Sequence, residues 1–270
     1  MPSKYRPQIF GWLSDLDKKN YDVPQHVHQL IFANDNYCAF IRLKHDDQFS
    51  GKFDYIPLTI VLSIIFVGMV IFMFLYGLNK ETIVSLVVFI IDCAALYLVI
   101  PGFYKNVFSR MGNPIIFNRK TSKVYVNESY FFNFKVLHHP KVFLQPKKRR
   151  IQEYDWNDLH GVIIHNLLRD FAPVTLLMVC QSGTNKVIDH VMLEPKGAAS
   201  GRIIIWNWIN NFMMFYKSVN IDGGKYKTDE EAKFKTDMIE GEGWPEWMVE
   251  AFNATSLEEL AAIKQKYNIK

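Results

Sequence analysis

Cysteine is scarce in this sequence, and the clustered ligands of a metal site are missing. The three cysteines, Cys38, Cys93 and Cys180, are odd in number and widely spaced in 270 residues, which argues against a disulfide framework. The eight histidines include close pairs, but none stands with cysteines or carboxylates at the spacing of a zinc site. We therefore expect a chain that uses neither disulfides, nor a metal, nor another cofactor.

Catalytic motifs are also lacking. The small residues 197–201 precede an apolar segment, but they lack the Gly-Lys-Ser or Gly-Lys-Thr ending of a phosphate-binding loop. We find no serine elbow, no two carboxylates spaced as acid and base, and no cysteine beside a histidine partner. The formal net charge of +4 is modest and does not favour nucleic acid as a partner. The sequence thus favours a non-enzymatic protein that acts by binding.

Two long apolar runs dominate the chain. They span residues 57–77 and 82–101, and four residues join them. Each is about 20 residues long, which at roughly 1.5 Å per residue suffices to cross a hydrocarbon core of about 30 Å. The first run is uncharged and the second contains only Asp92. This pattern predicts a transmembrane helical hairpin, with a buried pair of soluble helices as the alternative.

Basic residues flank the two runs on one side. They are Arg42, Lys44 and Lys52 before the first run and Lys105, Arg110, Arg119 and Lys120 after the second, against Lys80 alone in the connection. Because basic loops tend to remain in the cytoplasm, this bias predicts a multi-pass membrane protein with both termini cytoplasmic.

Asp92 falls near the middle of the second run and is a candidate membrane-embedded site. Counting back from the turn places Gly68 at the same depth, where a missing side chain would let the helices approach. A hydrogen bond to Ser63, Ser85 or Thr59 within the chain is one interpretation. Contact with a second copy in a homodimer or with a partner, and a proton or ion path, are the others.

The rest of the chain predicts short strands followed by helices. Strands are predicted over residues 36–44, 114–118, 123–127, 141–145, 151–155, 159–165, 174–181 and 185–193. A broad apolar helical face follows at 200–219, with Ser200 as its N-cap. This order of elements resembles the pleckstrin-homology superfold, a curved antiparallel barrel closed by a C-terminal helix.

The predicted fold class is therefore an α+β membrane protein. If the strand at 36–44 pairs with those after Pro114, the hairpin is an insertion in one pleckstrin-homology-like domain; alternatively, the N-terminal segment packs separately. The predicted parts are an N-terminal segment (1–56), the hairpin (57–101), the β domain (102–220) and a C-terminal linker with helices (221–270), the last two helices beginning near Trp244 and Ser256.

Two further groups of residues are candidates for binding. Lys147, Lys148, Arg149 and Arg150 form a basic run that is suited to lipid head groups or is simply a solvated turn. The partner-binding candidates are aromatic, with core packing as the alternative: Tyr130, Phe131, Phe132, Phe134, Trp244 and Trp247.

The overall layout resembles a group of bacterial inner-membrane proteins, some of which are immunity proteins for toxins of type VI secretion. The paired apolar runs, PIIFNRKTSKVYV at 114–126 and YDWNDL at 154–159 carry this resemblance. It implies a membrane-anchored protein that binds and neutralises a cognate protein toxin. The alternatives are a lipid-sensing or scaffolding protein of the inner membrane and a small transporter subunit.

Overall fold

The computed structural model divides the chain into two compact units. It describes residues 2–22, 27, 29–41, 45–76, 86–97, 99, 114–129, 149–165, 173–194, 203–215 and 228–269. Unit 1 comprises Met1–Leu43, Met111–Glu128 and Arg149–Lys270, and unit 2 comprises Lys44–Arg110 and Ser129–Lys148. The chain therefore leaves unit 1 twice and returns to it twice.

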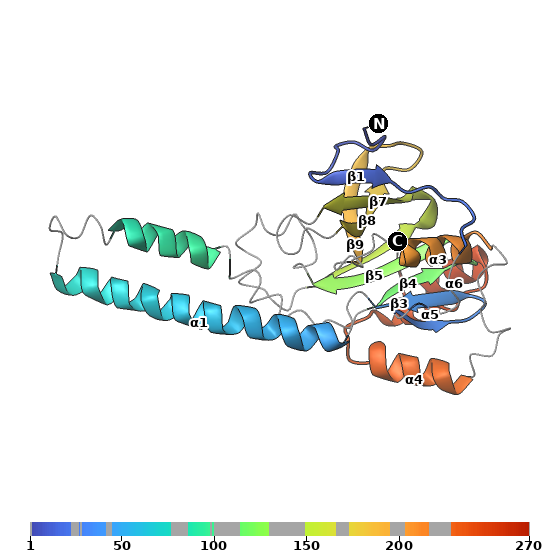
Figure 1. Cartoon of the computed structure of the whole chain (residues 1–270). Helices are drawn as coiled ribbons and strands as arrows, with labels where there is room; N and C mark the ends of the chain where they lie inside the picture. Colours follow the sequence, from blue (N-terminus) through green and yellow to red (C-terminus); the bar gives the residue numbers. More distant parts are fainter. Residues whose placement is uncertain are drawn as a thin grey trace. The chain divides into compact units, whose positions relative to one another are not determined.

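Unit 1 contains two antiparallel sheets (Figure 1). The first sheet has the order β1-β7-β8-β9, and the second has the order β2-β3-β4-β5-β6. The strands of the first sheet are β1 (Trp12–Asp15), β7 (Leu159–His165), β8 (Pro173–Cys180) and β9 (Val187–Glu194). The strands of the second sheet are β2 (Leu30–Ala33), β3 (Tyr37–Phe40), β4 (Ile115–Asn118), β5 (Lys123–Ser129) and β6 (Arg149–Asp155).

The fold class predicted from the sequence is wrong, because these strands do not form a single barrel around a membrane insertion. After β6, a 3-10 turn at Trp156–Asp158 passes the chain into β7, which belongs to the other sheet. The α+β character remains, as two sheets with helices. Of the predicted strands, 141–145 lies outside the described residues, and β1 and β2 were not predicted.

The strand pairing predicted across the large insertion is confirmed. Tyr37 lies opposite Asn118 and Phe40 opposite Ile115, so residues 44–110 are inserted between two neighbouring strands. The predicted hairpin of β4 and β5 is also present, with Asn118 opposite Lys123. The segment before the insertion is therefore part of the same sheet.

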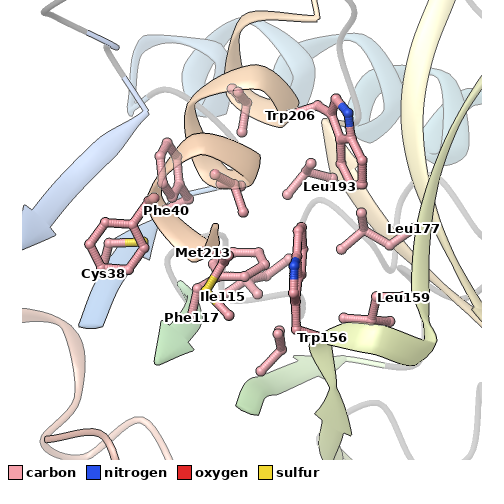
Figure 2. Close-up of a cluster of buried hydrophobic side chains, with 14 of the residues drawn as sticks. Cys38, Phe40, Ile115, Phe117, Trp156, Leu159, Leu177, Leu193, Trp206 and Met213 are labelled. Carbon is pink, nitrogen blue, oxygen red and sulfur yellow. The ribbon is translucent and has the colours of Figure 1, made fainter. Parts of the chain in front are cut away.

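The second sheet is buried on both faces. Cys38, Phe40 and Phe117 face a core that also receives α3 (Ile204–Met213) and residues of the first sheet (Figure 2). Tyr37 and Ile116, which alternate with them, face the C-terminal helices. Burial on both faces accounts for the continuous apolar sequence of β3 and β4, all of whose residues but Asn118 are apolar.

Tryptophans fill the core between α3 and the sheets. The ring of Trp208 lies 5.2 Å from that of Phe40, and Trp156 lies 5.5 Å from Trp206. A Cβ atom on Gly161 would come within 2.8 Å of the Trp206 ring. Gly161 therefore allows α3 to pack closely against β7. The helix is shorter than the predicted 200–219, and Ser200 lies outside the described residues.

The other face of the second sheet is covered by three helices, α4 (Thr228–Met238), α5 (Glu246–Ala251) and α6 (Leu257–Lys266). The predicted capping residue of the last helix is confirmed, since the Glu259 amide donates to Ser256 Oγ at 3.2 Å. Much of the predicted linker is helical, because α4 begins at Thr228 and buries Phe234 against Phe32, 5.3 Å between ring centres.

Asn118 ties these helices to the sheet. Its side chain is fully buried, and its amide donates to the carbonyl oxygens of Phe252 at 3.0 Å and Ala254 at 2.9 Å. Its Oδ1 accepts from the backbone amides of Lys120 at 2.8 Å and Thr121 at 2.9 Å. One side chain thus fixes both the turn after β4 and the link between α5 and α6.

Two charged residues near the turn after β4, Arg119 and Lys123, also have structural contacts. The Arg119 guanidinium pairs with Asp35 at 2.9 Å and lies 4.8 Å from the centre of the Phe212 ring. Lys123 pairs with Asp155 at 2.7 Å. The charged residues of this motif therefore hold neighbouring elements of unit 1 together.

In unit 2, α1 (His45–Tyr76) extends over 32 residues, and a second helix occupies residues 86–97. Among the described residues, no helix is both long enough and apolar enough to cross a membrane. The predicted transmembrane hairpin at 57–101 and the multi-pass inner-membrane location with cytoplasmic termini are therefore wrong.

Replacing Asn118 should loosen the C-terminal helices. We expect Asn118→Ala to lower the free energy of unfolding by about 2–4 kcal/mol, because buried carbonyls lose their donor and the turn amides lose their acceptor. Asn118→Asp keeps the acceptor oxygen but replaces the donating NH2 group with a second oxygen. This variant should therefore also lower the free energy of unfolding. Urea denaturation measures both, and exposed Asn253→Asp is the control, with an effect within about 0.5 kcal/mol. Equal stability of Asn118→Ala and Asn253→Asp would contradict this role.

Candidate functional site

Unit 2 exposes a large set of aliphatic side chains. Ile64 and Leu75 on α1 are 66% and 69% exposed, and Ile91 on the helix over 86–97 is 62% exposed. We call the following residues the aliphatic surface: Leu58, Ile60, Val61, Ile64, Ile65, Val67, Val70, Ile71, Leu75, Leu86, Val87, Val88, Ile90 and Ile91. Single exposed apolar residues are ordinary, but so many on two neighbouring helices are unusual for a protein surface.

Asp92 is buried, although it lies on the same helix as several of these exposed residues. Its side chain is 6% exposed, and Oδ2 has no hydrogen-bond partner among the described residues. One turn before it, Phe89 stacks on Phe66 of α1 with 5.1 Å between ring centres. Asp92 is therefore a buried acceptor beside the contact of the two helices.

The other two residues predicted as membrane-embedded sites are Ser63 and Gly68, both on α1. Ser63 is exposed, and a Cβ atom added to Gly68 would meet nothing within 4 Å. Gly68 is thus not a point of close helix approach. Ser85 lies outside the described residues.

The four residues of the predicted basic run, 147–150, do not share one environment in the part of the chain that the structure describes. Lys147 and Lys148 lie outside the described residues, and Arg149 lies 3.8 Å from Glu242. Arg150 is buried, where it contacts Glu128, Asp189 at 2.5 Å and the His190 carbonyl oxygen at 2.9 Å. Arg150 is therefore enclosed by protein groups and does not present a charge to solvent.

The Arg150 cluster joins the two sheets. Arg150 and Tyr154 lie on β6 of the second sheet, whereas Asp189 lies on β9 of the first. The Tyr154 hydroxyl donates to Asp189 Oδ2 at 2.9 Å. Burial disfavours the Arg150 charge, but the surrounding Glu128, Tyr154 and Asp189 outweigh it and raise the pKa of Arg150. The cluster is a buried ion network that holds two sheet edges together.

The predicted aromatic partner-binding residues fall into two groups. Tyr130, Phe131, Phe132 and Phe134 lie outside the described residues. Trp244 is buried against Phe252, with 5.0 Å between ring centres, and Trp247 is half-buried near Tyr125 at 6.4 Å. Both tryptophans belong to the packing of α5 on the second sheet.

A second polar cluster, not predicted from the sequence, lies under the N-terminal segment. Tyr5 stacks on His160 of β7 at 4.7 Å, and Lys18 Nζ donates to the Trp156 carbonyl oxygen at 2.5 Å. The Asp15 carboxylate accepts from Ser3 Oγ at 2.7 Å and Trp12 Nε1 at 2.8 Å. These contacts attach the N-terminal segment to the first sheet.

The titratable groups of this cluster have shifted pKa values. Burial, followed by the charges of Lys18 and Lys4, lowers the pKa of His160 to about 4, although Asp158 and Asp15 oppose this. Burial lowers the pKa of Lys18 to about 8. Among the described residues, no three histidine, cysteine or carboxylate side chains are placed to hold a metal ion. The cluster's observed bonds are those of structural attachment.

The sequence carried little signal for this cluster, because residues 3–18 and residues 156–160, which form it, are far apart along the chain. Tyr5 and His160 meet only when the N-terminal segment crosses β7. No local spacing of residue types reports such a contact.

Comparison with known proteins identifies a family. Residues 92–240 match a family described as "Family of unknown function (DUF6708)". No curated protein and no solved structure matches the chain significantly. The matched range begins at Asp92 and includes β4 to β9, α3 and α4.

The Arg150 cluster predicts a large stability difference between two adjacent arginines. Arg150→Ala should lower the free energy of unfolding by about 3–5 kcal/mol, because Glu128 and Asp189 would remain buried without their cation. Arg149→Ala, the control, should cost no more than about 1 kcal/mol, as expected of a longer ion pair nearer the surface. Chemical denaturation measures both, and similar losses would contradict the assigned role of Arg150.

His160 predicts a loss of stability in acid. The unfolded chain takes up a proton at this residue near pH 6.5, whereas the folded chain does so near pH 4, so the free energy of unfolding falls as the pH is lowered through this interval. Solvent screening at this half-buried site limits the effect to about 1–2 kcal/mol. His160→Phe keeps a ring against Tyr5 and should lose less stability between pH 7 and 4.5 in urea titrations. An identical loss in both proteins would exclude His160 as the cause.

Proposed function

Because the chain belongs to the DUF6708 family, whose function is unknown, we propose from its structure that it is a protein-binding, non-enzymatic immunity protein that neutralises a toxin. The observation that carries this proposal is the aliphatic surface of unit 2. The resemblance of the layout to immunity proteins of type VI secretion supports the choice of a toxin as the partner. The occupant we propose is an apolar helical segment of that toxin.

The aliphatic surface suits a helical protein segment. Its residues lie on two helices, which present ridges and grooves into which the side chains of a third helix fit. Burial of apolar area is favourable by roughly 25 cal/mol per Å², and branched side chains such as Ile64 and Ile71 lose little conformational freedom on contact. Such a surface gains affinity by excluding water from both partners.

Neutralisation by binding requires no chemistry from the immunity protein. A toxin whose apolar helix is covered cannot use that helix against its target. The charged clusters of unit 1 support this interpretation, since Arg150 and Arg119 are engaged by carboxylates of the same chain. In this proposal the toxin contacts unit 2, and unit 1 takes no direct part in binding.

Growth rescue tests the proposal. A bacterium expressing the open reading frame adjacent to this gene should stop growing, and co-expression of the intact chain should restore growth. Ile64→Glu combined with Ile71→Glu should abolish rescue, because two carboxylates on the aliphatic surface must be desolvated by an apolar partner. Both positions are exposed, so the folded chain should be retained, which circular dichroism verifies.

Ile188→Glu is the matched control. Ile188 is 52% exposed, similar to Ile71, but it lies on β9 in unit 1. This variant should rescue growth like the wild-type chain. Rescue by the double variant, or a toxic neighbour that the wild-type chain does not neutralise, would contradict the proposal. If the chain floats with protein-free lipid vesicles, lipid and not a toxin helix is the ligand of the aliphatic surface. That result would also contradict the proposal.

A further inference from the structure

We propose that three side chains of α3 form a binding site for a polypeptide segment, and that the segment of a second copy of this chain occupies the site when the chain's own segment leaves. Trp206, Asn210 and Asn211 form this site, which we call the α3 docking site. The segment that it holds in the structure is residues 2–22. This inference concerns unit 1 and goes beyond the proposed function.

The α3 docking site holds the segment through main-chain atoms. Trp206 Nε1 donates to the carbonyl oxygen of Asp17 at 3.1 Å. Asn210 Nδ2, four residues along the helix, donates to the carbonyl oxygen of Lys19. The side chains of Asp17 and Lys19 are 66% and 62% exposed. The helix therefore contacts the main chain at these positions, while the side chains that distinguish one sequence from another face solvent.

Asn211 contacts both polar groups of one residue's main chain. Its Oδ1 accepts from the amide of Tyr21 at 3.1 Å, and its Nδ2 donates to the carbonyl oxygen of Tyr21 at 2.6 Å. A side-chain amide that donates to and accepts from the same residue pairs with it as a neighbouring strand would. Such a pair binds a polypeptide in one direction and one register.

Few side chains of the segment are buried. Among residues 2–22, Ser3, Tyr5 and Leu16 are buried, whereas every residue of β4 is. In the first sheet β1 stands at the end of the strand order and pairs with β7 alone. Elements with few buried apolar contacts open at a lower free energy than the core of the same fold. The segment can therefore leave while the rest of unit 1 stays folded.

A second copy offers the occupant that fits the α3 docking site. Trp206 is fully buried in the structure, and its apolar ring meets water when the segment leaves. Every contact that the segment makes within one chain can be made identically by the segment of another chain. Exchange of an identical element between two copies is a low-cost route to a dimer.

Two full-length variants that complement each other test the inference. Leu16→Asp places a carboxylate at a buried position, so this chain releases its own segment but keeps the α3 docking site. Asn211→Leu removes the contacts with Tyr21, so this chain has an intact segment and a damaged site. The mixture should contain a complex of one copy of each variant, which neither variant forms alone. Size-exclusion chromatography with light scattering measures the mass of this complex.

Leu13→Asp is the matched control. Leu13 also lies on β1 but is 41% exposed, so the carboxylate stays in water and the segment stays in place. Its mixture with Asn211→Leu should contain no complex. Circular dichroism verifies that each variant is folded. If Leu16→Asp does not fold, Tyr5→Ala takes its place, because it loosens the segment by removing the stack on His160.

Peptides of residues 2–22 test the main-chain contacts on the Leu16→Asp chain. In fluorescence anisotropy the natural sequence should bind, and alanine at both Asp17 and Lys19 should change its affinity by no more than about twofold, because these side chains are exposed. An ester in place of the amide between Asn20 and Tyr21 removes the N–H group that donates to Asn211. The ester peptide should bind about tenfold more weakly.

Four results would overturn the inference. If folded variants form no complex and the peptide does not bind, the segment is a fixed part of unit 1, and the proposed function, which depends on unit 2, is unaffected. Peptide binding without a complex would reject a second copy as the occupant. Equal binding of the ester peptide would reject the main-chain contacts with α3. An equal complex in the Leu13→Asp mixture would place the association elsewhere on the chain.

Discussion

Burial of the second sheet on both faces is the constraint on which the rest of unit 1 depends. A sheet with two apolar faces needs a cover on each side, and α3 with the first sheet supplies one while α4, α5 and α6 supply the other. The order of elements along the chain follows from this need. The first cover comes from β1 and from residues 159–213, and the second from residues after 228, so neither half of the chain completes the fold alone.

Polar side chains hold these layers in register. Asn118 connects the end of β4 to the α5–α6 link, and Arg150 connects β6 to the edge of the first sheet at Asp189 and His190. Each lies in an apolar environment where an unpaired group is costly, so the arrangement that satisfies it is strongly preferred over slipped alternatives. Apolar burial drives these layers together, and the buried polar groups determine how they fit.

Strand positions were predictable from sequence, but the roles of charged and aromatic residues were not. Alternation of β-branched and polar residues locates β4, β5 and β7 closely. Whether Arg150 faces solvent or carboxylates depends on Asp189, 39 residues away, and no local pattern reports that. The sequence around Trp244 is compatible with a binding residue, but in the structure its ring is buried against that of Phe252. The prediction of a transmembrane hairpin from the two apolar runs failed for a different reason. The composition of a run does not specify where a helix begins and ends.

The pairing of Phe40 with Ile115 has a consequence for how this chain can vary. Because those residues are opposite each other in neighbouring strands, everything between them replaces what would otherwise be a short hairpin turn. The entropy of closing such a loop grows only slowly with its length, so unit 1 tolerates inserted segments of very different size at this point. Unit 2 can accordingly change in sequence and length while the sheet into which it is inserted keeps its register.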